Sequence, residues 1–324
     1  MKLIIDVDTG IDDALALLYV LASPEADLLA VTCTSGNVEA TQVAENTIAL
    51  LDLCGRSDIE VALGRREPLK RPLMIAPETH GPKGIGYATL PSPSRGVSER
   101  HSADLIAEEL RRAPGEVTLI TLGPLTNLAV ALQREPALPH LARNLVMMAG
   151  SYRSPGNTAP TSEWNVACDP EAMQAVLSAW ESAEGVSRPV ALGLDVTERA
   201  KFLPDHLERL HAAAGNPQAN RVLQFIDDAL RFYMEFHSRY DGFYGAFIHD
   251  ALAVAGALDP SLLYAEALPV QVELDGTLTS GETVTDWRRV WGRPANLEIG
   301  VAADIETFFA RYIERVGGLA ARAA

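Results

Sequence analysis

The sequence predicts an α/β fold: a single domain with a mostly parallel central sheet flanked by helices. Short aliphatic and β-branched runs alternate with longer helical patterns along the chain, as in a parallel sheet covered on both faces. The 324 residues are 48% hydrophobic, which is enough for one large core. No segment has the composition of a linker, so we expect residues 1–324 to form one domain.

Each element follows from the residue pattern of its segment. Six apolar runs are predicted to be buried strands: Leu3–Val7, Leu28–Thr32, Ile59–Leu63, Val117–Leu122, Leu145–Ala149 and Val190–Leu194. The helical patterns between them are Ala14–Ala22, Val43–Leu53, Ala103–Arg112, Leu125–Gln133 and Pro170–Trp180. Later come the helical stretches Leu203–Ala213 and Ala219–Ser238, a strand-rich patch Pro269–Ile299 and a closing helix Ile305–Val316. The Pro- and Gly-rich segment Gly64–Arg100 is the longest irregular stretch.

Composition narrows the possible partners and locations. The 27 Lys and Arg against 43 Asp and Glu give a net charge of −16, which disfavours nucleic acid and anionic membrane surfaces as partners. Three separated cysteines, Cys33, Cys54 and Cys168, match neither a disulfide framework nor a zinc site. The approach to Asp6 is too short for a signal peptide, and no apolar run reaches membrane-spanning length. We therefore expect a cytoplasmic protein.

The opening segment "KLIIDVDTGIDDALALL" carries four aspartates between a strand and a helix. Helix capping explains one or both of Asp12 and Asp13 but leaves Asp8 unexplained. Carboxylates that converge without a basic neighbour in sequence repel one another unless a cation lies among them. Because His and Cys are absent nearby, the pattern favours a hard ion, Ca²⁺ or Mg²⁺, and its spacing is not that of an EF-hand.

Polar residues also follow the other predicted strands. Ligands of open parallel sheets bind beyond the carboxyl ends of the strands. There the chain places Asn37 in "TSGN", His80 in "THGPKG", the segment "LGPLTN", and Asn157, Glu163 and Asn165 in "GSYRSPGNTAPTSEWN". Asn and Glu beside an aromatic suit sugar hydroxyls, which need donors and acceptors. A plainer interpretation of "SEWN" is a loop that packs its tryptophan against the core. For His80 the plainer interpretation is a surface position.

A second dense cluster is "FIHDALAVAGAL", in which His249 and Asp250 open a helical run. The plain interpretation is a helix cap beside a surface histidine. In the context of the other carboxylates, Asp250 could complete the shell of a cation, and His249 suits proton transfer near neutral pH. The aromatic residues of the preceding helix, Phe232, Tyr233, Phe236 and Tyr240, are expected in the core, although one of them could line a pocket.

These motifs together resemble the nucleoside hydrolases of the inosine–uridine-preferring type. The resemblance runs in order through "DVDTGIDDALAL", "TSGN", "LGPLTNLA", "GNTAPTSEWNVACDPEA", "LDVT" and "HDALAV", over most of the chain. It implies a single domain with a Rossmann-like core that hydrolyses the N-glycosidic bond of ribonucleosides with Ca²⁺. It also implies a nucleoside substrate, a part in purine and pyrimidine salvage, and a homodimer or homotetramer.

The resemblance assigns roles position by position. Asp8, Asp13, Asp250 and the backbone carbonyl of Leu122 would hold the calcium. Asp12, Asn157, Glu163 and Asn165 would bind the ribose hydroxyls, and His80 would also bind the substrate. Asn37 would lie close to the attacked carbon, with Asp8 as the general base and His249 as the acid that protonates the leaving base. Two departures are Lys83, where the family often has an acidic residue or a serine nearby, and Ser280, where an arginine is frequent.

Two other classes of protein remain as alternatives. A haloacid-dehalogenase-like, Mg²⁺-dependent phosphatase would use "DVDTG" with Asp6 as the nucleophile and Asp8 as the acid and base, but it also needs a later lysine and an acidic pair. Lysine is scarce, and the later pair Asp227–Asp228 falls in a helical pattern. A non-catalytic nucleoside- or ribose-binding protein would keep the calcium pocket without hydrolysis.

Overall fold

Eight strands form the central sheet of the computed structural model, which describes residues 1–215 and 220–323. Their order across the sheet is β3 (Glu60–Leu63), β2 (Asp27–Cys33), β1 (Lys2–Val7), β4 (Val117–Thr121), β5 (Asn144–Met148), β6 (Val190–Leu192), β12 (Leu297–Ala303) and β9 (Leu263–Leu268). All neighbours pair in parallel except β9, which is antiparallel to β12. The single α/β domain with a mostly parallel sheet is confirmed.

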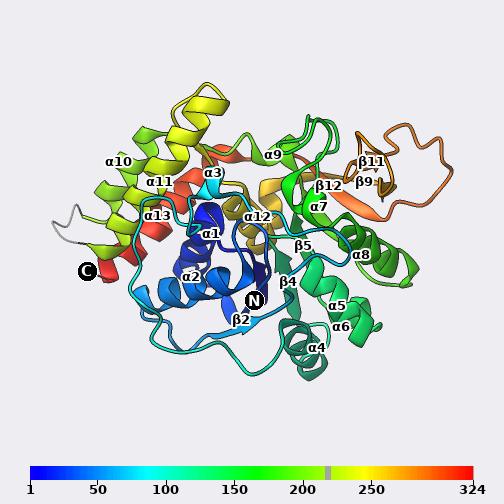
Figure 1. Cartoon of the computed structure of the whole chain (residues 1–324), viewed down its shortest axis with the longest axis horizontal. Helices are drawn as coiled ribbons and strands as arrows, with labels where there is room; N and C mark the ends of the chain where they lie inside the picture. Colours follow the sequence, from blue (N-terminus) through cyan, green and yellow to red (C-terminus); the bar gives the residue numbers. More distant parts are fainter. Residues whose placement is uncertain (216–219, 324) are drawn as a thin grey trace.

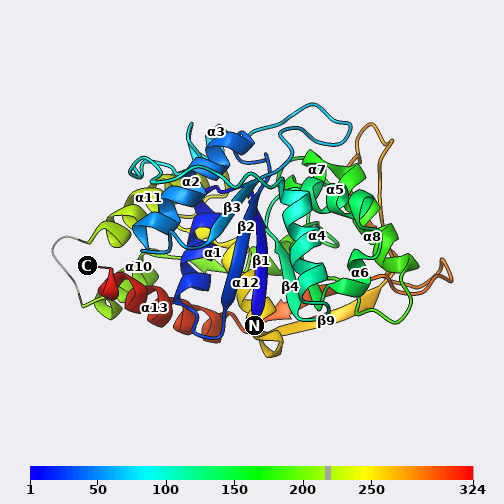
Figure 2. The same cartoon turned by 90° about the horizontal axis from the view of Figure 1, so that it is seen from below.

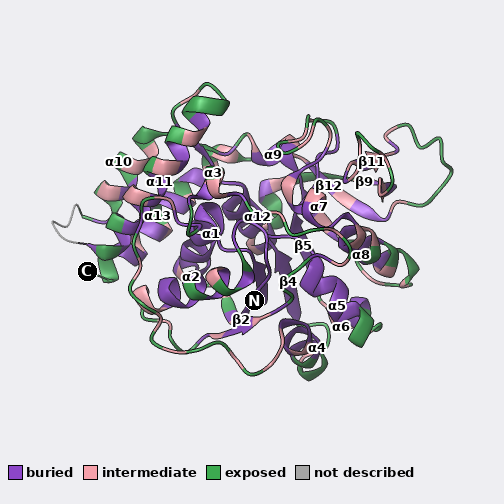
Figure 3. Cartoon of the chain, viewed as in Figure 1, coloured by how far each residue is buried: buried purple, intermediate pink, exposed green. Residues whose placement is uncertain are grey.

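Helices cover both faces of this sheet (Figures 1 and 2). One face carries α1 (Ile11–Ala22), α2 (Ala40–Leu53), α10 (Pro204–Ala213), α11 (Arg221–Tyr240), α12 (His249–Leu258) and α13 (Ile305–Arg322). The other carries α4 (Ser102–Arg112), α5 (Thr126–Arg134), α6 (Leu138–Leu141) and α8 (Pro170–Ser182). In β1, Leu3 and Ile5 join the first core and Ile4 joins the second, because alternate side chains of a strand point to opposite faces. The sheet and the helix faces toward it are buried (Figure 3).

The six predicted strands are confirmed, each to within two residues at either end. The helical segments are also confirmed, although α1 and α2 each begin three residues earlier than predicted. One predicted boundary, Ala219, lies outside the described residues. Helix α11 begins at Arg221, where the side-chain oxygen of Asn220 accepts hydrogen bonds from the amides of Val222 and Leu223 (2.9 and 3.0 Å).

The closing helix is longer than predicted and continues to Arg322. Glycine usually weakens a helix, but Gly317 lies where α13 packs closely against α10. A Cβ atom at Gly317 would lie 2.6 Å from the Cβ of Ala213. The glycine therefore permits helix packing here instead of ending the helix.

The sequence patterns missed several short or exposed elements. The edge strand β9 has mostly exposed side chains and so lacks a buried run. The predicted strand-rich patch contains β10 (Val270–Val272), β11 (Thr283–Thr285) and β12, but the pair β7 (Lys201–Phe202) and β8 (Ala246–Phe247) was not expected. The short helices α3 (Pro77–His80), α7 (Trp164–Cys168), α9 (Leu194–Thr197) and the 3₁₀ helix η1 (Pro260–Leu262) were also missed.

The carboxyl ends of the parallel strands meet at one end of the molecule. Helices α3 and α7 lie at that end, opposite the start of β1 (Figure 2). The loops that carry the polar motifs therefore converge where an open parallel sheet binds ligands. In the part of the chain that the structure describes, no helix combines the length and apolar character needed to cross a membrane.

Candidate active site

Buried aspartates from both ends of the chain meet beyond the end of β1. Asp12 and Asp13 lie in the first turn of α1, and Asp250 lies in the first turn of α12. One carboxylate oxygen from each of these three residues lies within 4.8 Å of the other two, and all three side chains are buried. The two helices pack against each other, so this convergence is a consequence of the fold.

Asp13 joins the cluster to Asp8 through the backbone. Its Oδ1 accepts a hydrogen bond from the amide of Asp8 (3.1 Å), and its Oδ2 accepts from the amide of Gly10 (2.8 Å). Oδ2 also accepts from Nδ2 of Asn37 (3.1 Å). The capping interpretation is therefore correct for Asp13, which closes the first turn of α1 while facing the other carboxylates.

Asp8 lies in a confined space with one free oxygen. Its Oδ2 accepts a hydrogen bond from the amide of Asn37 (2.8 Å), whereas the buried Oδ1 has no partner among the described residues. A Cβ atom at Gly36 would lie 2.1 Å from Oδ2, and one at Gly123 would lie 2.7 Å from Oδ1. The glycines of "TSGN" and "LGPLTN" are thus required for the carboxylate of Asp8 to fit.

Burial and mutual repulsion make this cluster costly when all its members are charged. Burial raises the pKa of Asp8, Asp12, Asp13 and Asp250, and neighbouring carboxylates raise the pKa values of Asp8, Asp12 and Asp250 further. The potential metal ligands here are all oxygens, and one of them, Oδ1 of Asp8, is buried without a hydrogen-bond partner among the described residues. This donor set fits a hard divalent cation, which would compensate the negative charge.

A second group of polar side chains comes from the loop after β5 and from α7. Glu163 caps α7: its Oε1 accepts from the amide of Asn165 (2.7 Å), and its Oε2 accepts from the amides of Gly150 and Val166 (2.9 and 3.1 Å). Nδ2 of Asn165 donates to the carbonyl of Leu122 (2.7 Å). The loop is therefore fixed to the ends of β4 and β5.

Asn157 lies in the same loop, where its Oδ1 accepts a hydrogen bond from the amide of Trp164 (2.9 Å). Burial raises the pKa of Glu163, and the hydrogen bonds from the three backbone amides offset part of this increase. These side chains combine donors and acceptors in one place, as hydroxyl recognition requires.

The two predicted site histidines are buried, so the surface interpretation is wrong for both. Nδ1 of His80 accepts a hydrogen bond from the amide of Ile11 (3.1 Å), which leaves the proton of the neutral ring on Nε2. Nδ1 of His249 lies 2.8 Å from Oγ1 of Thr197. Burial lowers the pKa of each histidine to about 3, so both are neutral at pH 7 in the free protein.

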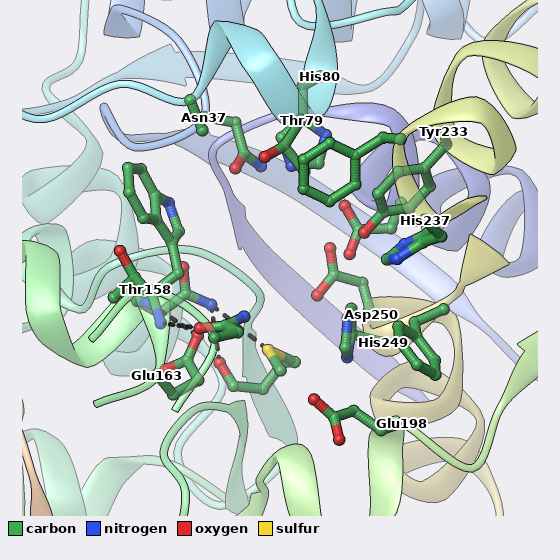
Figure 4. A pocket seen from close by; sticks show the side chains of 18 of the residues that line it. Asn37, Thr79, His80, Thr158, Glu163, Glu198, Tyr233, His237, His249 and Asp250 are labelled. Atoms are coloured by element: carbon green, nitrogen blue, oxygen red, sulfur yellow. Dashed lines mark hydrogen bonds between the residues drawn. The ribbon is translucent and has the colours of Figure 1, made fainter. Parts of the chain in front are cut away.

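These groups surround one cavity of about 610 Å³ (Figure 4). Nine of the eleven predicted site residues line it: Asp12, Asn37, His80, Leu122, Asn157, Glu163, Asn165, His249 and Asp250. Asp8 and Asp13 are not in the lining, but they are hydrogen-bonded directly to Asn37, which is. The structure therefore brings all eleven residues to one place.

The opposite wall of the cavity contains residues that sequence reasoning missed. Figure 4 shows His237 and Tyr233 on the side away from Glu163 and Thr158, with Glu198 near His249. Nδ1 of His237 lies 2.7 Å from Oδ2 of Asp241, and its Nε2 has no hydrogen-bond partner among the described residues. A His and an Asp four residues apart on a helix were a usable signal, because such residues share a helix face.

The aromatic residues of α11 do more than fill the core. Tyr233 is buried as predicted, but Tyr240 is 58% exposed, and both line the cavity together with Phe236. Phe232 instead packs edge-on against Tyr87. The sequence pattern allowed for one pocket-lining residue among the four, and three of them line the cavity.

Asp6 and the two departures from the family pattern lie outside the cavity lining. Asp6 is 2% exposed within β1, and its Oδ1 accepts hydrogen bonds from Thr32 and Asn127. These bonds give Asp6 a structural place in the sheet, which disfavours its use as the nucleophile of the phosphatase alternative. The carbonyl of Lys83 accepts a hydrogen bond from Asn46 (2.7 Å), and the carbonyl of Ser280 accepts one from Ser162 (2.7 Å).

An open parallel sheet with a carboxylate-rich cavity at its strand ends defines a class of metal-assisted α/β enzymes. Residues 3–310 match the family described as inosine-uridine preferring nucleoside hydrolase. The chain is 36% identical to a pyrimidine-specific ribonucleoside hydrolase of an Enterobacter species, over 99% of each protein. It is 34% identical to the inosine-uridine preferring nucleoside hydrolase of Crithidia fasciculata, over 98% of each.

Solved structures agree with this relationship. A purine-preferring ribonucleoside hydrolase from Gardnerella vaginalis superposes with a TM-score of 0.91 and 28% identity, over 99% of this chain and 100% of that one. The chain belongs to the inosine-uridine preferring nucleoside hydrolase family, and it is therefore an enzyme, a ribonucleoside hydrolase.

Proposed function

We propose that this chain hydrolyses the N-glycosidic bond of ribonucleosides with the help of Ca²⁺, releasing ribose and the free base. The observation that carries the proposal is the meeting of buried, mutually repelling carboxylates beside a cavity that also holds Glu163, Asn165 and two histidines. Substrate and cation would fill this space together.

The cation would be held by Asp8, Asp13, Asp250 and the carbonyl of Leu122. Oδ1 of Asp8 supports this set because it is buried and has no hydrogen-bond partner in the part of the chain that the structure describes. Asp12 lies within the same 4.8 Å group as Asp13 and Asp250, so it borders both the cation and the ribose. When bound, the cation supplies positive charge that fixes the ribose hydroxyls and the attacking water in one geometry.

The ribose would lie between the aspartates and the loop of α7. Asp12, Glu163, Asn157 and Asn165 supply acceptors and donors for its hydroxyls, and all four line the cavity. His80 offers an Nε2–H group from the opposite side, because its Nδ1 is occupied by the amide of Ile11. Asn37 would lie nearest to the attacked carbon, since its backbone and side chain contact Asp8 and Asp13.

The chemistry follows from the charges that develop in the reaction. Breaking a ribosyl C–N bond gives an oxocarbenium-like transition state, with positive charge on the sugar and negative charge on the base. Asp8 would take a proton from the water, and the surrounding carboxylates would stabilise the sugar. His249 would give a proton to the departing base. Because burial leaves His249 neutral at pH 7 in the free protein, it would take up that proton before this step.

The relatives differ in the base that they prefer: they include pyrimidine-specific, inosine-uridine preferring and purine-preferring enzymes. Their names therefore do not indicate which base this chain prefers. We expect the wall of α11, with Tyr233, His237 and Tyr240, to decide it, because this wall faces the cavity away from the ribose-binding loop.

The whole chain, residues 1–324, is proposed to act as one nucleoside hydrolase domain. The cytoplasmic location, the role in purine and pyrimidine salvage, and the homodimer or homotetramer remain predictions. Size-exclusion chromatography with light scattering would test the oligomeric state.

The test of the function is a panel of inosine, adenosine, guanosine, uridine and cytidine, with free ribose measured with and without a calcium chelator. We expect ribose release that the chelator abolishes and that added Ca²⁺ restores. Binding of a nucleoside without ribose release would instead favour the non-catalytic alternative.

A further inference from the structure

The segment "LDVT" matches the family pattern but has no role in the reaction proposed above. It forms α9, a single helical turn that directly follows β6 at the carboxyl edge of the sheet. Thr197, the last residue of this turn, is fully buried. Its hydroxyl lies between the backbone of α9 and the imidazole of His249.

The hydrogen bonds of that hydroxyl have a defined direction. Oγ1 of Thr197 donates to the carbonyl of Gly193 (3.1 Å). When His249 is the acid, both of its ring nitrogens carry protons, so toward Nδ1, 2.8 Å away, the hydroxyl acts as the acceptor. In that form Nδ1–H donates to Thr197, and Nε2–H is left for a substrate.

This contact fixes the ring to the sheet. The carbonyl of Gly193 also accepts hydrogen bonds from the amides of Val196 and Thr197 (both 3.1 Å). The carbonyl that holds the Thr197 hydroxyl is therefore itself fixed by the backbone of α9. Among the described residues, the contact with Thr197 is the one hydrogen bond that the side chain of His249 makes. Removing the hydroxyl would leave the ring held by packing alone, for example against Phe247.

We propose that Thr197 is a positioning residue for the leaving-group acid: it holds Nδ1–H of His249 so that Nε2 faces the departing base. This inference rests on the proposed function, because it assigns Thr197 a part in the step that His249 performs.

The proposed step balances without any rearrangement of this contact. His249 enters the step as the imidazolium, with a second proton taken up from solvent on Nε2. That proton passes to the base while the C1′–N bond breaks and its electron pair goes to the base. The water oxygen forms the new bond to C1′, and its proton goes to Asp8. His249 is left neutral with its proton on Nδ1, still donated to Thr197, so the same geometry serves before and after the transfer.

The test compares substrates that need the acid with one that does not. Uridine and inosine have poor leaving groups, whereas 4-nitrophenyl β-D-ribofuranoside releases a stable phenolate without protonation. For Thr197→Val we expect kcat on both nucleosides to fall about tenfold to hundredfold, the effect of a small displacement of a catalytic group. We expect kcat on the nitrophenyl riboside and KM for all three substrates to change by less than about threefold, since the sugar-binding groups stay in place.

Three further variants make the result specific. Thr197→Ser keeps the hydroxyl and should restore kcat on nucleosides. Thr118→Val is the matched control, because Thr118 is a buried threonine at the opposite end of β4, and its hydroxyl has no partner among the described residues. In a His249→Ala background, Thr197→Val should cause no further loss, because the two residues act as a unit. If Thr197→Val does not fold, Thr197→Ala takes its place in the same comparison.

Equal losses on nucleosides and on the nitrophenyl riboside would show that Thr197 is merely structural and would overturn the inference, as would unchanged kcat on nucleosides. Either result would leave the hydrolase activity standing. A wild-type protein that cleaves none of the three substrates would instead overturn the proposed function, and the inference with it.

Discussion

The two walls of the cavity differ in how they are built. The first wall includes Glu163 and is backed by Asp8 and Asp13. These residues lie in the loops and helix starts that follow β1 and β5, and each is almost fully buried and held by backbone amides. The wall with His237, Tyr240 and Asp241 comes from one helix, α11, and from its exposed end. The side chain of Asp241 is 42% exposed, whereas that of Asp13 is inaccessible.

This difference separates the constant part of the reaction from the adjustable part. Groups fixed by backbone hydrogen bonds at strand ends hold their geometry well, which suits the cation, the ribose and the water. A helix face that contacts the cavity through aromatic and polar side chains can change residue by residue without disturbing the sheet. We therefore expect changes in the first wall to abolish catalysis and changes in the second to alter the choice of base.

The largest expected effect is at Asp8. Asp8→Asn keeps the shape of the side chain but removes its charge and its capacity to take a proton, so kcat for uridine and inosine should fall by about 10²–10⁴-fold. Steady-state kinetics at saturating Ca²⁺ measure this. Asp104→Asn, at an exposed position on α4, is the control and should match the wild type. An Asp8→Asn enzyme with a wild-type kcat would remove Asp8 from the reaction.

Glu163→Gln should have the next largest effect. Both oxygens of Glu163 accept backbone hydrogen bonds, and the amide nitrogen of glutamine would face an N–H group instead. An unsatisfied buried donor costs about 1–3 kcal/mol, which predicts a loss of roughly 5- to 150-fold in kcat/KM if the loop of α7 shifts. The fluorescence of Trp164 in that loop should change in parallel. An unchanged kcat/KM would mean that the loop does not position the ribose.

The fold and the first wall could be predicted from the sequence because they depend on short-range patterns. Asp8 directly follows a buried apolar run, and Asn37 and Glu163 lie in the loops that follow two other runs. Because the carboxyl ends of parallel strands share one edge, the runs place these loops together. His237 and Glu198 come from elements whose positions depend on tertiary packing. The spacing of His237 and Asp241 shows that they share a helix face, but it does not show that this face borders the cavity. The edge strand β9 was missed for a related reason, since its exposed side chains give no buried run.

A smaller effect is expected at His237, and it should change selectivity. His237→Phe keeps the ring but removes the hydrogen-bonding nitrogens, so the ratio of kcat/KM between uridine and inosine should change by about 5- to 10-fold, the value of one hydrogen bond. Calcium affinity should stay the same. His211→Phe is the matched control, because His211 also lies 2.7 Å from an aspartate oxygen, through its Nε2 and Oδ1 of Asp227, but is not in the cavity lining. A ratio that stays constant would assign the choice of base to other residues.

The smallest effect concerns stability and comes from Asp6. Burial raises the pKa of Asp6 from 3.8 to about 7, above its unfolded value. The neutral form of Asp6 therefore contributes to the free energy of unfolding fully below about pH 4, and this contribution is lost as the pH rises through about 7. In the presence of a chelator, Asp6→Asn should raise the Tm at pH 8 by at least about 2 °C, since 1 kcal/mol corresponds to roughly 2–4 °C in domains of 150–250 residues. The gain should vanish at pH 4, and a variant that melts lower than the wild type at pH 8 would contradict this.

The most direct measurement of the central idea is a calcium titration of the chelator-treated protein, with bound ion and ribose release followed in the same samples. The account predicts about one ion per chain, activity that rises in proportion to the bound ion, and at least about tenfold weaker binding in Asp250→Asn, because one carboxylate of the set is lost. Full ribose release in the chelator, with no ion bound, would contradict it.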